Sequence, residues 1–466
     1  MAANFDLSKL LVINPNPTRS QKLSFVWKLS LPGMLAQISS ILMQYIDAAM
    51  VGSLGANASA SIGLVASSTW VIGSLSSALS IGYTVQVAHA VGEGNQNRAK
   101  GIMIKAAISC LTFSLPLTIL ALLLSGPLPI ILGAQKEIIK DASNYFFVYA
   151  LSTPFFQMIY LMGGMLQCSG NMKIPSILNS LLCILDAAFN VIFIKFMGLG
   201  VLGAAWGTTA SAIFVSVFMI YFAVHKSEYL GITRGRKPSL YYADKVFARA
   251  VNLQAFRLAA PIAVEKVAFT GALVAVTRII APLGATALSA NSFAVTAEAL
   301  CYMPAYGLSE AATTLVGQSY GARRKDLASS FSWITVIAGS LIMLFTGIIM
   351  YFLCPFVFEL LTPVKDIQEL AIQVLRIELF AEPFYGASIV ASGALRGQND
   401  TLIPSILNLI SLWIVRLGLS LLLVSRLALP GIWIAMAIEL GFRGIVLSAR
   451  LFYKVYVKRH ANRNSL

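Results

Sequence analysis

The chain has 466 residues, of which 58% are hydrophobic and only 11% are charged. Soluble domains carry about 25% charged residues, so this composition excludes an ordinary soluble enzyme or binding module and indicates a membrane protein. The formal net charge of +15 would suit nucleic acid, but the basic residues are concentrated in alternate predicted loops, which is the pattern that sets topology across a bilayer. We therefore expect contacts with membrane lipids and no nucleic-acid partner.

Twelve apolar runs are long enough to cross a hydrocarbon core as helices, which takes roughly 20 residues each. In chain order they are 24–52, 60–86, 101–125, 142–166, 174–197, 202–224, 254–282, 287–315, 329–353, 370–395, 404–426 and 431–456. The sequence thus predicts an all-α polytopic membrane protein with twelve transmembrane helices in two pseudo-symmetric six-helix lobes. The basic loops predict that both termini are cytoplasmic. The location that we expect is a bacterial plasma or inner membrane.

The two halves repeat with a fixed offset of 229 residues. Pro175-Ser-Ile-Leu-Asn179 returns as Pro404-Ser-Ile-Leu-Asn408, and parallel repeats of six helices are typical of secondary transporters. The predicted organisation is a cytoplasmic N-terminal segment (1–23), a first lobe (24–224), a cytoplasmic linker (225–253), a second lobe (254–456) and a cytoplasmic tail (457–466). Such a twelve-span unit can work as a monomer.

Polar side chains line one face of two predicted spans in the first half. At helical spacings of three and four, the first span carries Gln37, Ser40, Gln44 and Asp47, and the fifth carries Asn179, Cys183, Asp186 and Asn190. Carboxylates inside a membrane are costly and usually functional. The predicted cation-coupling residues are Asp47, Asp186, Asn190, Gln44 and Asn179, with Glu265, one turn after Pro261, as a candidate second ion or substrate site.

The duplication provides an internal control for these carboxylates. At the offset of 229, Asp47 and Asp186 are replaced by Val276 and Val415. If the aspartates only helped helices to pack, through hydrogen bonds that contribute roughly 1 kcal/mol in membranes, the other half would need equivalents. That structural reading remains an alternative, but the asymmetry favours an ion site in the first half.

Charged residues in the second half have plausible partners of opposite sign. Glu439 and Arg443 are four residues apart on one predicted helix, a spacing that favours an ion pair. Across helices, pairing is open to Arg278, Glu298, Glu382 and Arg416. We interpret these charges mainly as structural.

Prolines and large side chains suggest how the spans could bend and bind substrate. Bends are predicted at Pro32, Pro154, Pro261 and Pro383, which occupy equivalent places in the two halves and leave helix carbonyls without a partner. A substrate cleft is predicted around Gln37, Tyr45, Trp70, Met158 and Met162, because flexible Met-rich surfaces allow promiscuous binding. Core packing is an equal alternative for the large side chains.

Several motifs resemble the recurring signatures of the multidrug and toxic compound extrusion (MATE) family. They are Asp47-Ala-Ala-Met-Val-Gly-Ser-Leu-Gly55, Gly203-Ala-Ala-Trp-Gly207, Gly307-Leu-Ser-Glu-Ala-Ala312, Leu315-Val-Gly-Gln-Ser-Tyr-Gly-Ala322 and Leu395-Arg-Gly-Gln-Asn-Asp-Thr401. The resemblance implies two lobes around a central cleft, and export of cationic or amphiphilic compounds against inward proton or sodium flow. Asp47 matches the family's first-span acid. In the fifth span, bacterial members often have asparagine and then, four residues later, aspartate, whereas here Asp186 precedes Asn190.

Other functions fit the sequence less well. A lipid-linked saccharide flippase of related architecture would be expected to have basic residues in its cleft, and the spans of the first half hold almost none. A polytopic enzyme is disfavoured because the chain has neither a His-Glu-x-x-His nor a Gly-x-Ser-x-Gly motif. The five scattered cysteines predict neither a metal site nor a disulfide framework. No cofactor is expected beyond the coupling ion, H⁺ or Na⁺. Channel function stays an alternative to transport.

Overall fold

The computed structural model describes residues 16–232 and 244–457. Parts of the predicted N-terminal segment, linker and tail (1–15, 233–243 and 458–466) lie outside the described residues. Across those two described ranges the chain forms helices and short connections, with no strand. The expected all-α polytopic fold is confirmed.

The first six predicted spans all fall on helices. These are α2 (Arg19–Gly52), α3 (Ala56–Gly92), α4 (Gln96–Leu124), α6 (Lys136–Cys168), α7 (Lys173–Asn190) continued by the π-helix η1 (Val191–Phe196), and α8 (Gly200–Tyr221) continued by η2 (Phe222–Lys226). A short helix, α5 (Pro127–Ile131), connects α4 to α6.

The last six predicted spans likewise fall on helical segments. These are α9 (Lys245–Ile280) followed by η4 (Ala281–Leu283), α10 (Ala285–Gly321), α11 (Lys325–Leu361), the pair α12 (Lys365–Glu378) and α13 (Glu382–Gly397), then α14 (Leu402–Ile410), η5 (Ser411–Arg416), α15 (Leu417–Phe452) and η6 (Tyr453–Val457). The last two spans share α15, whose backbone breaks at Ala428 (φ 51°, ψ −134°) just before Pro430.

Nine helices in the described ranges are long and apolar enough by themselves to cross a membrane. That number is compatible with twelve spans for three reasons. Residues Leu402–Tyr456 form one candidate but hold two predicted spans, α12 and α13 are each shorter than 18 residues, and α10, which contains two glutamates, is not among the nine.

The chain separates into two compact units that divide inside helices. Residues 38–266 belong to the first unit, and residues 16–37 and 267–457 to the second. The dividing points therefore fall after Gln37 in α2 and after Lys266 in α9, and they are 229 residues apart. The structure thus divides at equivalent places in the two halves of the repeat.

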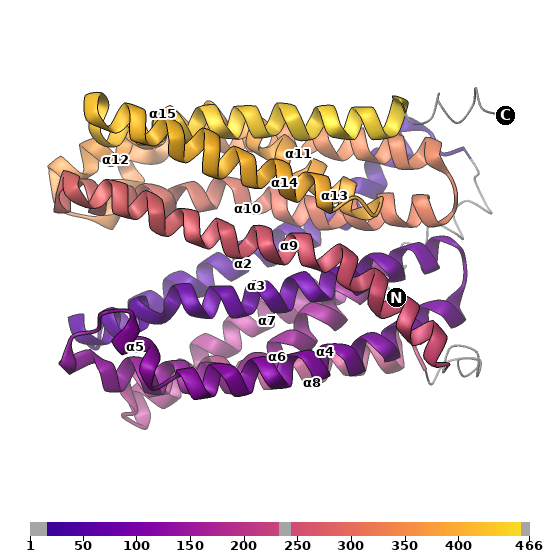
Figure 1. Cartoon of the computed structure of the whole chain (residues 1–466), viewed down its shortest axis with the longest axis horizontal. Helices are drawn as coiled ribbons and strands as arrows, with labels where there is room; N and C mark the ends of the chain where they lie inside the picture. The colour runs from indigo at the N-terminus through magenta and orange to yellow at the C-terminus, as the bar shows by residue number, and fades with distance from the viewer. Residues whose placement is uncertain (1–15, 233–243, 458–466) are drawn as a thin grey trace. The chain divides into compact units, whose positions relative to one another are not determined.

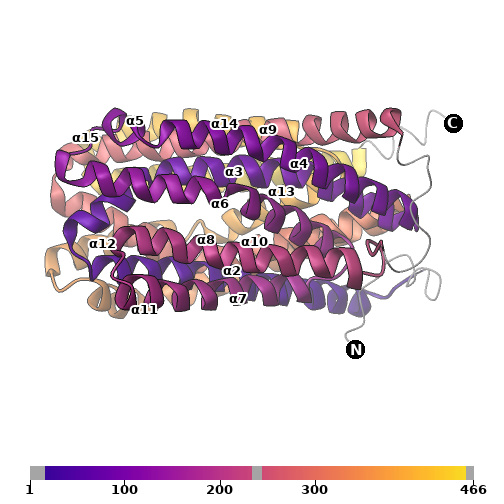
Figure 2. The ribbon, with the colours of Figure 1, turned by 90° about the horizontal axis from the view of Figure 1, so that it is seen from below.

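The first unit has an apolar interior built mainly by α3, α4, α6 and α8. Helices α3, α4 and α6 lie side by side in Figure 2. The first part of α9 packs closely on α3, because Gly82 faces the backbone carbonyl of Ala255 with no room for a side chain. Two hydrogen bonds fix this contact: Tyr83 Oη donates to Asn252 Oδ1 at 3.0 Å, and Gln86 Nε2 donates to the carbonyl of Val251 at 3.0 Å.

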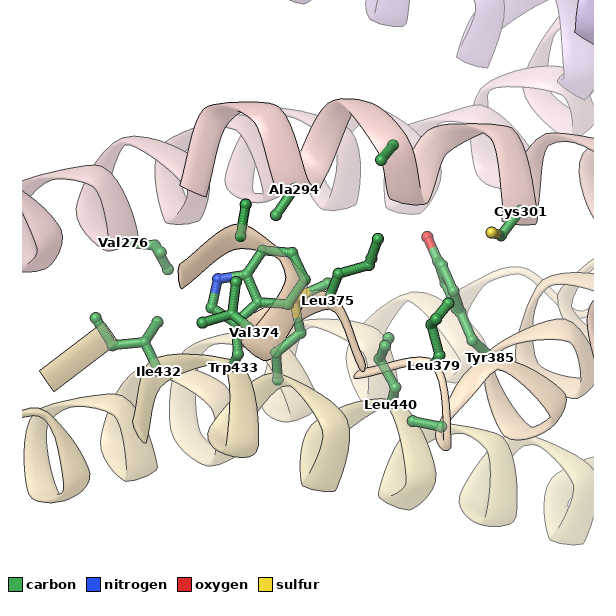
Figure 3. Packing of buried hydrophobic residues seen from close by; sticks show 14 of the residues in the cluster. Val276, Ala294, Cys301, Val374, Leu375, Leu379, Tyr385, Ile432, Trp433 and Leu440 are labelled. Carbon is green, nitrogen blue, oxygen red and sulfur yellow. The ribbon is translucent and has the colours of Figure 1, made fainter. Parts of the chain in front are cut away.

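The second unit has its own core, to which six helices labelled in Figure 1 contribute buried side chains: α9, α10, α11, α12, α13 and α15. Trp433 lies at its centre among Val374, Leu375 and Ile432 (Figure 3), and its indole Nε1 donates to Asn291 Oδ1 at 3.1 Å. The first part of α2 packs against α10 where Gly307 leaves room for the backbone of residues 33 and 34. Burial of these apolar side chains is the main source of this unit's stability.

The close approach at Gly82 gives a test of the packing in the first unit. Gly82→Val should lower the free energy of unfolding by about 2 kcal/mol, because the added atoms meet backbone that cannot move aside cheaply. Gly63 lies in the same helix and is exposed, and a Cβ added there would meet no atom within 4 Å, so Gly63→Val is the matched control. Thermal unfolding in detergent measures both, and equal midpoints for the two variants would contradict this packing.

Candidate functional site

A single amide connects two carboxylates inside the first unit. The side-chain nitrogen of Asn190, near the end of α7, donates to Asp47 Oδ1 of α2 at 2.9 Å and to Asp186 Oδ2 of α7 at 3.1 Å. Asp186 and Asn190 are 0% and 1% exposed, whereas Asp47 is half-buried. The structure therefore brings together three of the predicted coupling residues, from two helices.

Helix α8 completes the surroundings of Asp186 with hydroxyl groups. Ser211 Oγ lies 3.5 Å from Asp186 Oδ1, and the side chain of Thr208 lies near the same carboxylate. The hydroxyl of Tyr145 on α6 lies within electrostatic range of both aspartates. Four helices, α2, α6, α7 and α8, thus contribute polar groups to one small site.

Local backbone structure explains how Asn190 reaches both carboxylates. The α-helical part of α7 ends at Asn190, and the π-helical turn η1 starts at the next residue; such turns are frequent at functional sites. Gly207 on α8 faces the amide of Asn190, and a Cβ there would collide with Asn190 Oδ1. Gly203 similarly faces the backbone of Phe193. The two glycines of the Gly203–Gly207 motif therefore let α8 pack closely against α7 and η1.

The arrangement can exchange a cation because it joins two groups of like charge. Two carboxylates that share a buried site repel each other when both are ionised, and a bound proton or small cation removes the repulsion. The shared amide donor stabilises negative charge on both. Site chemistry of this type suits reversible proton or cation binding, and it offers no nucleophile or acid–base pair set against a reacting bond.

Other predicted coupling residues lie outside this group. Gln44 is exposed, and Asn179 is half-buried two turns before Asp186 on α7. Glu265 is half-buried in the part of α9 that belongs to the first unit. No contact described in the structure joins any of the three to the aspartate pair, so their coupling roles stay predictions.

The predicted substrate residues are dispersed. Gln37 belongs to the second unit, where its Nε2 donates to Glu310 Oε1 at 3.1 Å. Trp70 is 57% exposed, while Met158 and Met162 are buried in the apolar interior of the first unit. Tyr45 is half-buried on α2. The burial of the two methionines supports the packing alternative for them, and the cleft assignment stays a prediction.

The four predicted bend prolines lie in helical segments or at a helix start. Pro32, Pro154 and Pro261 are inside α2, α6 and α9, and Pro383 is in the first turn of α13, directly after the break that follows α12. Among the described residues no group of three or more His, Cys, Asp or Glu is arranged to hold a metal ion.

The sequence analysis did not predict the residues that α8 and α6 contribute to the site. These are Ser211, Thr208 and Tyr145. Single hydroxyl groups are common in membrane spans and show no characteristic spacing. Gly207 is part of a motif, but its role as the space for Asn190 depends on the contact between α7 and α8. The signal that could have revealed the role of Gly207 is the presence of small residues in the sixth span, opposite the polar stripe of the fifth.

Comparison with known proteins gives consistent matches along the chain. The family model MatE matches residues 32–192 and 261–422, one match in each half. Probable multidrug resistance proteins NorM are similar: that of Thermotoga maritima is 28% identical over 422 residues, covering 89% of each chain, and that of Oceanobacillus iheyensis is 24% identical over 447 residues, covering 94% of this chain and 98% of its own. A crystal structure of MATE in complex with MaL6 superposes with a TM-score of 0.88 at 20% identity, covering 94% of this chain and 97% of its own.

The bridging amide should matter most when both carboxylates are charged. Asn190→Ala should lower the free energy of unfolding by about 2 kcal/mol at high pH, because a donor to charged groups is lost, and by less at acidic pH, where the carboxylates are neutral. Thermal unfolding across a pH series measures this. The control is Asn252→Ala, since Asn252 accepts from the neutral hydroxyls of Tyr83 and Ser109. A pH-independent loss in both variants would contradict the assignment.

Proposed function

The chain belongs to the MATE family of membrane transporters, and on this premise we propose that it exports cationic or amphiphilic small molecules in exchange for a cation, with the proton as the first choice. It is a multi-pass membrane protein and a transporter rather than an enzyme. The single observation that carries the proposal is the pair of carboxylates, Asp47 and Asp186, that share the amide of Asn190 inside the first unit.

Exchange of substrate for a proton would follow if both compete for the negative charge of the Asp47–Asp186 pair. When the pair is fully ionised it attracts a cationic substrate, and when it takes up a proton that attraction weakens. Alternating access would expose the site to one side of the membrane at a time, so that proton entry on the outside accompanies substrate release there. Pro32 in α2 supplies a position where this helix can bend, which would couple the protonation of Asp47 to movement.

The direction of the amide supports the proton over sodium. Asn190 turns its NH₂ group toward both carboxylates, so a hydrogen-bond donor, and not the amide oxygen, faces the acidic pair. Sodium is held by oxygen ligands and is repelled by such a donor, whereas a proton needs only one carboxylate oxygen. For the Asn190 side-chain oxygen to act as a sodium ligand, the amide would have to rotate and break both hydrogen bonds.

The alternative of a lipid-linked saccharide flippase finds less support in the site. A pyrophosphate group needs basic partners, and the contacts of Asp47, Asp186 and Asn190 are with hydroxyl, amide and carboxylate groups.

We further propose that the protein lies in a bacterial cell membrane with both termini in the cytoplasm. It would function as a monomer in contact with lipid, with no bound cofactor apart from the coupling ion.

The central test is transport by variants of the acidic pair. In proteoliposomes with an imposed pH gradient, Asp47→Asn and Asp186→Asn should each reduce the export of a cationic dye at least tenfold, because one exchangeable charge is lost. Asp244→Asn, an exposed carboxylate before α9, should keep wild-type transport. A third variant exchanges the two residues, Asp186→Asn with Asn190→Asp, and should recover much of the activity because two carboxylates and one amide remain.

Two outcomes would sink the proposal. Wild-type export by Asp47→Asn would remove the pair from the mechanism. Equal export with no gradient, or movement only down the dye's own gradient, would indicate a channel. The same vesicles with a sodium gradient in place of the pH gradient separate the two ions, and the proposal expects export with the pH gradient alone.

A further inference from the structure

The end of α15 carries a cluster of charged side chains that the proposed function does not use. Arg450 Nε and Nη2 donate to Asp400 Oδ2 at 3.1 and 2.9 Å, and Lys454 Nζ lies 3.2 Å from the same oxygen. Lys454 also donates to the carbonyl of Gln398 at 3.2 Å. Asp400 and Gln398 lie in the short connection between α13 and α14. We call Asp400, Arg450 and Lys454 the basic corner of the second unit.

The basic corner has more positive than negative charge. Two cations, Arg450 and Lys454, share a single oxygen of one carboxylate, Asp400. The sequence around them adds no further negative charge, because the chain after Arg443 has five Lys or Arg and no Asp or Glu. Three of those five, Arg450, Lys454 and Lys458, are spaced four residues apart. A local excess of positive charge of this kind attracts anions.

The cations of the basic corner are more accessible than its carboxylate. The side chains of Arg450 and Lys454 are 26% and 18% exposed, whereas that of Asp400 is 8% exposed. An approaching group therefore meets hydrogen-bond donors before it meets an acceptor. Guanidinium and ammonium groups are the usual protein partners of phosphate.

The surroundings of the basic corner suit the border between hydrocarbon and lipid headgroups. Tyr453 and Tyr456 are both exposed, and tyrosine is enriched where helices leave the hydrocarbon. The guanidinium of Arg450 lies 5.8 Å from the centre of the Tyr453 ring. Two exposed apolar side chains, Ile445 and Phe442, lie about one and two turns before Arg450 on the same helix. A phosphate group at this corner would thus have an apolar helix surface next to it.

The equivalent corner of the first unit is built without these charges. At the offset of 229, the three positions of the basic corner are Asn171, Tyr221 and His225. Tyr221 and His225 stack on each other, with ring centroids 5.2 Å apart. The same helix ends can therefore be held together by an aromatic contact, so packing alone does not account for two cations around one carboxylate.

We propose that the basic corner binds the headgroup of an anionic phospholipid, with Arg450 and Lys454 contacting its phosphate. Each Lys or Arg close to an anionic membrane surface strengthens attraction roughly fivefold. A soluble anion offers the same charge but has no acyl chain to cover Phe442 and Ile445, which favours lipid as the occupant. The cytoplasmic placement proposed for the termini puts this corner at the inner leaflet. Binding of lipid here does not depend on the proposed exchange of substrate for a cation.

Thermal unfolding of the purified full-length protein in a neutral detergent tests this site, because a lipid that binds the folded state raises the midpoint. Phosphatidylglycerol should raise the midpoint of the wild type more than phosphatidylcholine does, and the difference should shrink at high salt. Lys454→Gln leaves the ion pair of Arg450 with Asp400 in place and should weaken the apparent affinity for phosphatidylglycerol roughly fivefold. The matched control is Arg98→Gln, which changes a cation already paired with Glu93 at 2.6 Å and should leave the lipid effect unchanged.

Each variant is compared with itself in the absence of lipid, so a loss of stability caused by the substitution does not enter the result. Asp400→Asn keeps both cations and should bind phosphatidylglycerol at least as tightly as the wild type. If Lys454→Gln and Arg450→Gln respond to phosphatidylglycerol as the wild type does, the corner is only an internal ion pair and the proposal is wrong. An equal rise of the midpoint with inorganic phosphate in place of lipid would indicate a site for small anions and would also overturn it.

Discussion

The structure depends on how ionisable groups are accommodated where water is scarce. A carboxylate in a bilayer needs a hydrogen-bond donor, an opposite charge or a proton. The first unit meets this need with one amide, Asn190, which donates to Asp47 and Asp186. That single donor serves two groups of like charge, so a bound proton or cation would relieve their repulsion. The proposed exchange of substrate for a cation rests on this arrangement.

The two halves share a backbone plan but not a polar interior. Their dividing points in α2 and α9 and their family-model matches follow the same repeat. Their charged groups do not: the aspartates of the first unit have valine counterparts, and the buried glutamates of the second stand where the first has uncharged side chains. Duplication thus supplied the helices, and each unit then placed its acids at different positions. The two units therefore differ in the positions of their buried acids.

Much of the fold could be predicted from the sequence, because long apolar runs and a fixed repeat determine the spans almost directly. The ion pair of Glu439 with Arg443 was also predictable, since both lie on one helix. The contact of Asn190 with Asp47 could be predicted only in part. Spacing gave the polar face of each helix, but not the rotation of α7 toward α2, which depends on the fit between Gly207 and Asn190. The burial of Glu378 and Glu382 with no hydrogen-bond partner among the described residues could not be predicted, because it depends on how the helices of the second unit pack.

The most direct test of the account is to count the protons released when a cationic substrate binds to the purified protein. Calorimetric titration in buffers of different ionisation enthalpy gives this number. The account predicts that the wild type releases about one proton per substrate cation at a pH where the pair is half titrated, and that a variant with asparagine at both 47 and 186 releases none. The same proton release from both proteins would contradict it.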